Sequence, residues 1–60
     1  MKKQAGEIEV GDTIVERDSN LEWLVEGRTV QPDGLLFYVS GHGQIGELML
    51  DEDERVEVLV

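Results

Sequence analysis

The feature that most constrains the fold is a run of five apolar residues enclosed by turn residues. The run extends from Leu35 to Val39, follows Pro32-Asp33-Gly34 and precedes Gly41-His42-Gly43. Five residues are too few for a typical helix, whereas a short apolar run between turn signals is typical of a strand at the centre of a sheet, apolar on both faces. We therefore expect a central β-strand at about residues 35–40, with the rest of the chain packed around it.

Alternation of apolar and polar residues predicts the other strands. Leu21, Trp23 and Val25 share one face of the second strand, and Gly27 predicts a bulge after which the buried parity passes to Val30. In the last strand Val56, Val58 and Val60 are expected to face inward. The predicted strands cover about residues 12–17, 21–30, 35–40, 44–50 and 55–60.

The connections between these strands are predicted from turn chemistry. Asp18-Ser19-Asn20, Pro32-Asp33-Gly34 and Gly41 to Gln44 are rich in residues that favour tight turns. Four adjacent carboxylates, Asp51 to Glu54, repel one another in a sheet, so we expect a single helical or 3₁₀ turn there. Residues 1–6 are expected to form a flexible arm.

This layout resembles the SH3-like small barrels, and Val10-Gly11-Asp12-Thr13-Ile14-Val15 is similar to the V-G-D-x-V-x-V opening of several SH3-like and KOW-type domains. The resemblance implies an all-β fold over residues 7–60: a five-stranded antiparallel SH3-like barrel with a single 3₁₀ turn before the last strand. The OB-fold is the alternative barrel, although the Gly41 to Gln44 connection leaves no room for the helix that usually follows its third strand.

The charge is strongly acidic, with fourteen Asp and Glu against five Lys and Arg and a formal net charge of −9. Such a surface repels phosphate backbones and anionic membranes and favours basic partners, although solubility alone also explains it. The chain has no cysteine and no apolar run near the ~20 residues that span a bilayer. A cytoplasmic protein without a signal peptide, from a short bacterial or phage reading frame, is expected.

No motif predicts a reaction centre. Gly41 to Gly46 matches G-x-G-x-x-G, but the dinucleotide fingerprint needs a helix start within a βαβ unit of ~30 residues, and the segment that follows is predicted to be a strand. His42 is the only histidine and is expected in an exposed loop. The acidic run from Asp51 to Glu54 fails the EF-hand pattern because Arg55 follows it. We expect no enzyme activity, no cofactor and no metal site.

Our preferred hypothesis is a small acidic interaction module that binds a protein partner. In one variant the partner is basic, and in another the acidic surface imitates nucleic acid. Trp23 and Phe37 are expected in the core, whereas Tyr38 points away from Phe37. The alternatives are a nucleic-acid-binding KOW or OB barrel and a structural role in a larger assembly. The oligomeric state stays open. The candidate partner contacts are Leu36, Tyr38, Asp51, Glu52, Asp53 and Glu54, and the nucleic-acid alternative would use Lys2, Lys3, Arg17, Arg28 and Arg55.

Overall fold

The computed structural model describes residues 1–59 and consists of antiparallel strands joined by short turns, as the sequence predicts. The hydrogen-bonded order of the strands is β1-β6-β2-β3-β4-β5. Among these residues no helix is long and apolar enough to cross a membrane. The elements are β1 (Lys2–Gln4), the 3₁₀ turn η1 (Ala5–Glu7), β2 (Thr13–Val15), β3 (Glu22–Gln31), β4 (Gly34–Gly41), β5 (Gln44–Leu50) and β6 (Arg55–Leu59).

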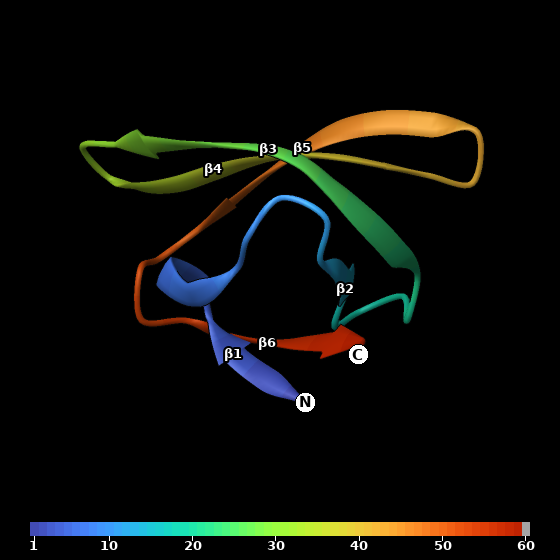
Figure 1. The fold of residues 1–60 in the computed structure, drawn as a ribbon, viewed down its shortest axis with the longest axis horizontal. Coiled ribbons are helices and arrows are strands. Elements are labelled where there is room, and N and C mark those ends of the chain that lie inside the picture. The colour runs from blue at the N-terminus through green and yellow to red at the C-terminus, as the bar shows by residue number, and fades with distance from the viewer. Residues whose placement is uncertain (60) are drawn as a thin grey trace.

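The sheet folds over on itself because β3 is long and irregular. Its first part pairs with β2 and its second part with β4, and the register shifts between Val25 and Gly27. This shift confirms the predicted irregularity at Gly27. Figure 1 shows β3, β4 and β5 on one side of the molecule and β1 and β6 on the other, with η1 between them. The long strand therefore belongs to both layers.

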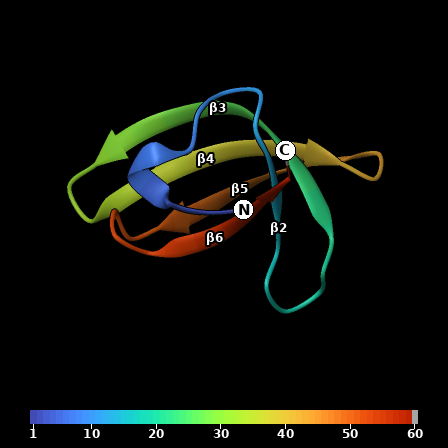
Figure 2. The ribbon, with the colours of Figure 1, turned by 60° about the horizontal axis from the view of Figure 1, so that its bottom comes forward.

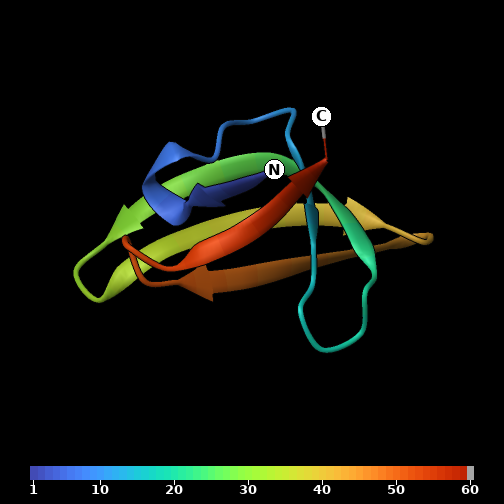
Figure 3. The ribbon, with the colours of Figure 1, turned by 90° about the horizontal axis from the view of Figure 1, so that it is seen from below.

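The expectation of five strands in a closed barrel needs correction. The sheet has six strands, and within residues 1–59 its two end strands, β1 and β5, each pair on one side only. The sheet is therefore open between β1 and β5. Figures 2 and 3 show β5 turning back into β6 at this opening through the acidic segment 51–54.

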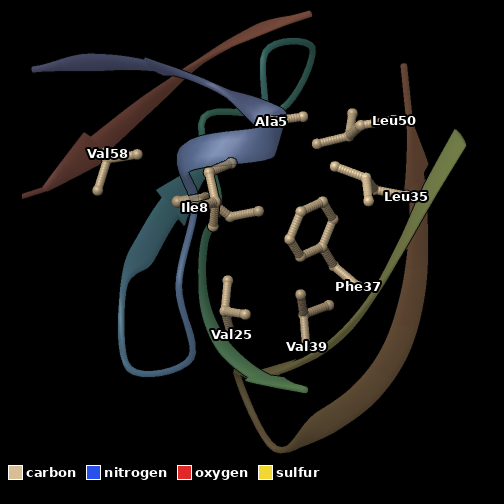
Figure 4. Packing of buried hydrophobic residues seen from close by; sticks show 9 residues of the cluster. Ala5, Ile8, Val25, Leu35, Phe37, Val39, Leu50 and Val58 are labelled. Carbon is tan, nitrogen blue, oxygen red and sulfur yellow. The ribbon is translucent and has the colours of Figure 1, made fainter. Parts of the chain in front are cut away.

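The core is entirely apolar and is centred on β4. Leu35, Phe37 and Val39 alternate along this strand and are buried, and the Phe37 ring is wholly inaccessible to solvent. Figure 4 shows Phe37 between its own strand neighbours and the side chains of Val25 and Ile8. The buried apolar residues are Ala5, Ile8, Ile14, Val25, Leu35, Phe37, Val39, Leu50 and Val58. The strand predicted at residues 35–40 and the burial predicted for Phe37 are confirmed, but β4 lies next to the edge strand β5 and not at the centre of the sheet.

The flexible arm expected at residues 1–6 is instead part of the fold. Lys2–Gln4 pairs with Arg55 to Glu57 of β6, and Ala5 and Ile8 contribute fully buried side chains. The Arg28 guanidinium donates a hydrogen bond to the Ile8 carbonyl oxygen at 2.7 Å. Two apolar residues three positions apart are too weak a pattern to predict burial from sequence. Ala5 and Ile8 are buried because they cover the part of the core that the open sheet leaves uncovered.

The 3₁₀ turn expected at Asp51 to Glu54 also needs correction. These residues form a simple turn in which the Glu54 N–H donates to the Asp51 carbonyl oxygen at 3.0 Å, and the 3₁₀ turn of the structure is η1. The Ala5 N–H donates to the Glu54 carbonyl oxygen at 2.8 Å, and the Gly6 N–H donates to that of Glu52 at 3.1 Å. Backbone bonding to η1 therefore determines the shape of this acidic turn.

Two apolar residues of the strand predicted at residues 21–30 are more exposed than their parity predicts. Val30 pairs with Leu35 and shares its face, yet 75% of its surface is exposed, because it lies one residue before the end of β3, next to the β3–β4 turn. Leu21, which precedes β3, is 40% exposed.

Trp23 is partly buried against the core, and its Nε1–H donates to Glu16 Oε1 at 3.1 Å. The inward orientation expected for Val60 lies outside the described residues.

The hairpin between β4 and β5 is confirmed, with a two-residue turn. His42 and Gly43 both have positive φ, 53° and 73°, the conformation that two-residue hairpins favour because it matches the twist of the strands. The turn fixes Gly41 opposite Gln44 and thereby sets the register of the whole hairpin. The last glycine of the G-x-G-x-x-G match, Gly46, lies within β5.

Candidate functional site

The outward face of β3, β4 and β5 carries the most prominent group of exposed apolar residues. The register places Leu36 opposite Met49, and Ser40 opposite both Leu24 and Ile45. The exposed fractions of Ile45, Met49 and Leu24 are 88%, 45% and 42%. We call the set Leu24, Leu36, Tyr38, Ile45 and Met49 the outer patch.

Tyr38 lies at the centre of the outer patch and is held by its neighbour across the sheet. It pairs with Gly27 on one side and with Glu47 on the other. A Cβ atom on Gly27 would lie 3.2 Å from Tyr38 Cδ2, so the ring rests against the glycine backbone. An aromatic ring that covers a glycine on the neighbouring strand compensates for the missing side chain there. Tyr38 is 41% exposed and therefore also presents apolar surface to solvent.

Carboxylates lie next to the outer patch. A shallow hollow of about 370 Å³ is lined by Tyr38, Val39, Ile45 and Gly46 together with Glu26 and Glu47. Glu47 belongs to the central cross-strand row, and both glutamates are exposed. The patch can therefore offer apolar contact and negative charge to the same ligand.

The acidic turn adjoins one end of this face. Asp51 follows Leu50, two residues after Met49, which itself faces Leu36. All four side chains, from Asp51 to Glu54, are exposed. No group of three or more His, Cys, Asp or Glu side chains within residues 1–59 has a geometry that could hold a metal ion. The structure thus pairs Leu36 with Met49, two residues before the acidic turn, whereas Tyr38 pairs with Glu47, four residues before it.

The five basic residues are divided between two clefts, and carboxylates line both of them. Lys3 Nζ lies 3.2 Å from Asp12 Oδ2, and Arg28 is bound to the Ile8 carbonyl oxygen. The other three line a cleft of about 560 Å³ between β5, β6 and the end of β2. Four carboxylates share this cleft with them, and its apolar lining comes from Val15, Leu48, Leu50 and Val56. The bases are Lys2, Arg17 and Arg55, and the acids are Glu16, Asp18, Glu54 and Glu57.

Two carboxyl groups have lowered pKa values. The hydrogen bond from the Glu9 backbone N–H, at 3.0 Å, lowers the pKa of Asp12, and Lys3 lowers it further. The hydrogen bond from the Met1 ammonium lowers the pKa of the exposed Glu57. Both groups hold the N-terminal segment against the sheet, which is a structural role.

His42 occupies the second hairpin turn and contacts Trp23. The two rings meet edge to face with centroids 5.7 Å apart. A Cβ atom on Gly41 would lie 3.3 Å from Trp23 Cε3 and 2.8 Å from the Glu22 carbonyl oxygen, so this glycine allows β3 and β4 to approach closely. The histidine is exposed, as predicted, and packs on an aromatic neighbour.

No protein family, curated protein or solved structure matches the chain.

The candidate contacts predicted from sequence included Leu36 and Tyr38 but missed Leu24, Ile45 and Met49. Alternation along residues 44–50 already separates Ile45 and Met49 from Leu48 and Leu50, so that signal was available. Leu24 could not be assigned, because it becomes part of the patch only through its pairing with Ser40.

Proposed function

We propose that this protein is a non-enzymatic module that binds a basic protein partner through the outer patch. The observation that carries the proposal is the exposure of Leu24, Tyr38, Ile45 and Met49 on one face of a three-stranded layer. Contiguous exposed apolar surface bordered by charge is typical of interaction sites. Glu26 and Glu47 beside it, and the net charge of −9, favour a partner with positive charge.

The proposed scaffold is an open variant of the SH3-like strand arrangement with one additional strand. Without β1, the strand order is β6-β2-β3-β4-β5, in which the last strand returns to pair with the first of the five. The irregular strand β3, shared by both layers, supports the same assignment. Fold alone does not determine function, so the proposed binding role depends on the outer patch.

A protein ligand has more support than a nucleic acid. Phosphate backbones are bound by clustered Lys and Arg, whereas two of the five bases here are engaged within the molecule and three share a cleft with four carboxylates. The exposed acids are also compatible with the proposed variant in which the protein imitates nucleic acid and occupies a DNA- or RNA-binding partner. A cytoplasmic location is part of the same proposal.

The test is affinity capture with matched surface variants. The Ile45→Ser/Met49→Ser double variant removes two apolar side chains from the outer patch. Val30→Ser is the control, because Val30 is 75% exposed but lies at the end of the β3–β4 hairpin and on the opposite face. We expect the double variant to lose a protein that wild type and Val30→Ser both retain from a host lysate. Equal retention by the wild type and both variants would contradict the proposed role of the patch.

Competition with DNA separates the two forms of the proposal. If the captured protein is displaced from the wild-type chain by duplex DNA or RNA in ~50 mM salt, the imitation variant is supported. If nucleic acid has no effect on retention, the imitation variant is wrong and the simple protein-binding role stands.

A further inference from the structure

The free edge of β5 carries the further inference, which rests on the proposed function. Gly41 and Gln44 flank a two-residue turn and therefore form a hydrogen-bonded pair, after which bonded and non-bonded pairs alternate along the hairpin. By this alternation Ile45, Glu47 and Met49 direct their backbone N–H and C=O groups away from β4. Within residues 1–59, β5 pairs with β4 alone, so these groups form an open hydrogen-bonding edge.

The two edges of the sheet differ in how well they could accept another strand. β1 is three residues long and includes Lys2 and Lys3, and short charged edges disfavour further pairing. β5 is seven residues long, and Glu47 is its only charged residue. The same three residues that expose their backbone on β5 also present their side chains on the outward face. An added strand would therefore extend the outer patch.

We propose that an extended segment of the partner adds to β5 as an antiparallel strand, with a lysine or arginine opposite Glu47 and apolar residues opposite Ile45 and Met49. Opposite charges facing each other across antiparallel strands are favourable, and apolar pairs extend the rows Leu36–Met49 and Ser40–Ile45. Antiparallel addition follows the orientation of every strand pair in the sheet.

The cleft beside β5 explains how the inner side of such a strand would be accommodated. Residues of the added strand that alternate with the outward ones would point to the inner side, where Leu48 and Leu50 line the cleft of about 560 Å³. Val15 and Val56 line the same cleft, together with seven charged residues. Because Leu48 and Leu50 are the cleft residues of β5 itself, we expect the segment to be apolar at the inward positions next to them, which makes the recognised pattern apolar on both faces with one central cation.

A second copy of this chain is a poorer occupant of the same edge. Symmetric antiparallel pairing of two β5 strands about their centre places Glu47 opposite Glu47, and like charges directly opposite are destabilising. Each copy also carries a net charge of −9, which opposes association. The glutamate at the centre of β5 thus favours a basic partner segment and disfavours self-pairing.

The experiment uses the full chain and a blocked peptide, Thr-Ser-Val-Leu-Lys-Leu-Val-Ser-Thr, followed by amide chemical-shift changes. We expect the changes to concentrate at residues 44–50. Methylating the lysine backbone nitrogen removes a donor that faces β5 and should weaken binding about tenfold. Methylating the nitrogen of the next leucine, which faces away from β5, is the matched control and should leave binding within about twofold.

Charge exchange tests the pairing with Glu47. Replacing the peptide lysine by glutamate should weaken binding to the wild-type chain about fivefold, and Glu47→Lys should restore binding of that peptide. The proposal is overturned if the two methylated peptides bind alike, if the shifts lie away from β5, or if the lysine peptide does not bind at ~1 mM. Concentration-dependent shifts at residues 44–50 without peptide would overturn it in favour of self-pairing.

These outcomes are distinguishable from failure of the proposed function. If Ile45→Ser/Met49→Ser abolishes partner capture while the methylated peptides bind alike, the outer patch binds a partner and strand addition is wrong. If the double variant captures normally, the proposed function fails whatever the peptides do.

Discussion

Shortening Ile8 to valine tests whether the N-terminal segment is an integral part of the core. Ile8 is completely buried, and Figure 4 shows its side chain directed toward the same space as Phe37 and Val25. Ile8→Val deletes one buried methylene group, which costs about 0.8 kcal/mol of transfer free energy, and a residual cavity adds to this cost. We expect a loss of about 0.5–1.5 kcal/mol in the free energy of unfolding.

This loss is measurable because the domain is small. A chain of this size has a total free energy of unfolding of roughly 3–9 kcal/mol. The assay is urea denaturation followed by the fluorescence of Trp23, the only tryptophan, together with a thermal scan. Each 1 kcal/mol should lower Tm by about 4–8 °C in a domain of this size.

The control for Ile8→Val is Val10→Ala, two residues further along. Val10 is 60% exposed, so its truncation should change the free energy of unfolding by less than about 0.5 kcal/mol. If Ile8→Val is as mild as Val10→Ala, the N-terminal segment does not cover the core as described, and the expectation of a loose arm would regain support.

Three further predictions follow from individual contacts. Because the Glu9 N–H and then Lys3 lower the pKa of Asp12, its ionised form stabilises the folded state above the ordinary carboxyl pKa, and this contribution is lost as pH falls through the lowered value. Asp12→Asn should therefore be less stable than wild type at neutral pH, with the gap narrowing below about pH 4. The control Asp33→Asn, on an exposed turn, should change the free energy of unfolding at neutral pH by less than about 0.5 kcal/mol. Gly43→Ala should lower the free energy of unfolding by about 1 kcal/mol in urea denaturation, because φ is 73° at this position. Gly46→Ala, with open space at its Cβ position, should lower it by less than about 0.5 kcal/mol. Equal losses would contradict the assigned turn. Glu16→Ala removes the acceptor of the Trp23 Nε1–H, so it should lower the free energy of unfolding by about 1 kcal/mol and shift tryptophan emission to longer wavelength. Glu16→Gln retains an acceptor oxygen and should keep most of the stability and of the wild-type emission wavelength.

The elements predicted best from sequence are those whose signals lie within a few residues of one another. Residues 44–50 were predicted as a strand and form β5, because alternation and the preceding turn act locally. The irregularity at Gly27 and the turn before Gly34 were found for the same reason, since glycine and proline limit the backbone directly. The pattern of Leu35, Phe37 and Val39 likewise identified the buried face of β4.

Prediction was weaker where burial depends on distant segments. Val30 has the parity of a core residue but lies beyond the core, and Ala5 has little apolar surface yet is fully buried beneath the acidic turn. For the candidate site, the sequence identified Tyr38 as an exposed contact. Its contact with Gly27, and the position of Leu24 on the same face, could be seen only from the register of β3. Neither relation appears as a spacing in the sequence.

The sequence by itself determined that this protein is built from antiparallel strands, where its hairpins turn and which face of β4 is buried, because these properties follow from side-chain alternation and backbone preferences over a few residues. Only the tertiary structure decided that residues 1–8 belong to the fold, that the sheet stays open, and that β5 is its longer free edge. These features arise when strands far apart in the chain pair, since pairing determines which backbone groups and apolar side chains remain uncovered.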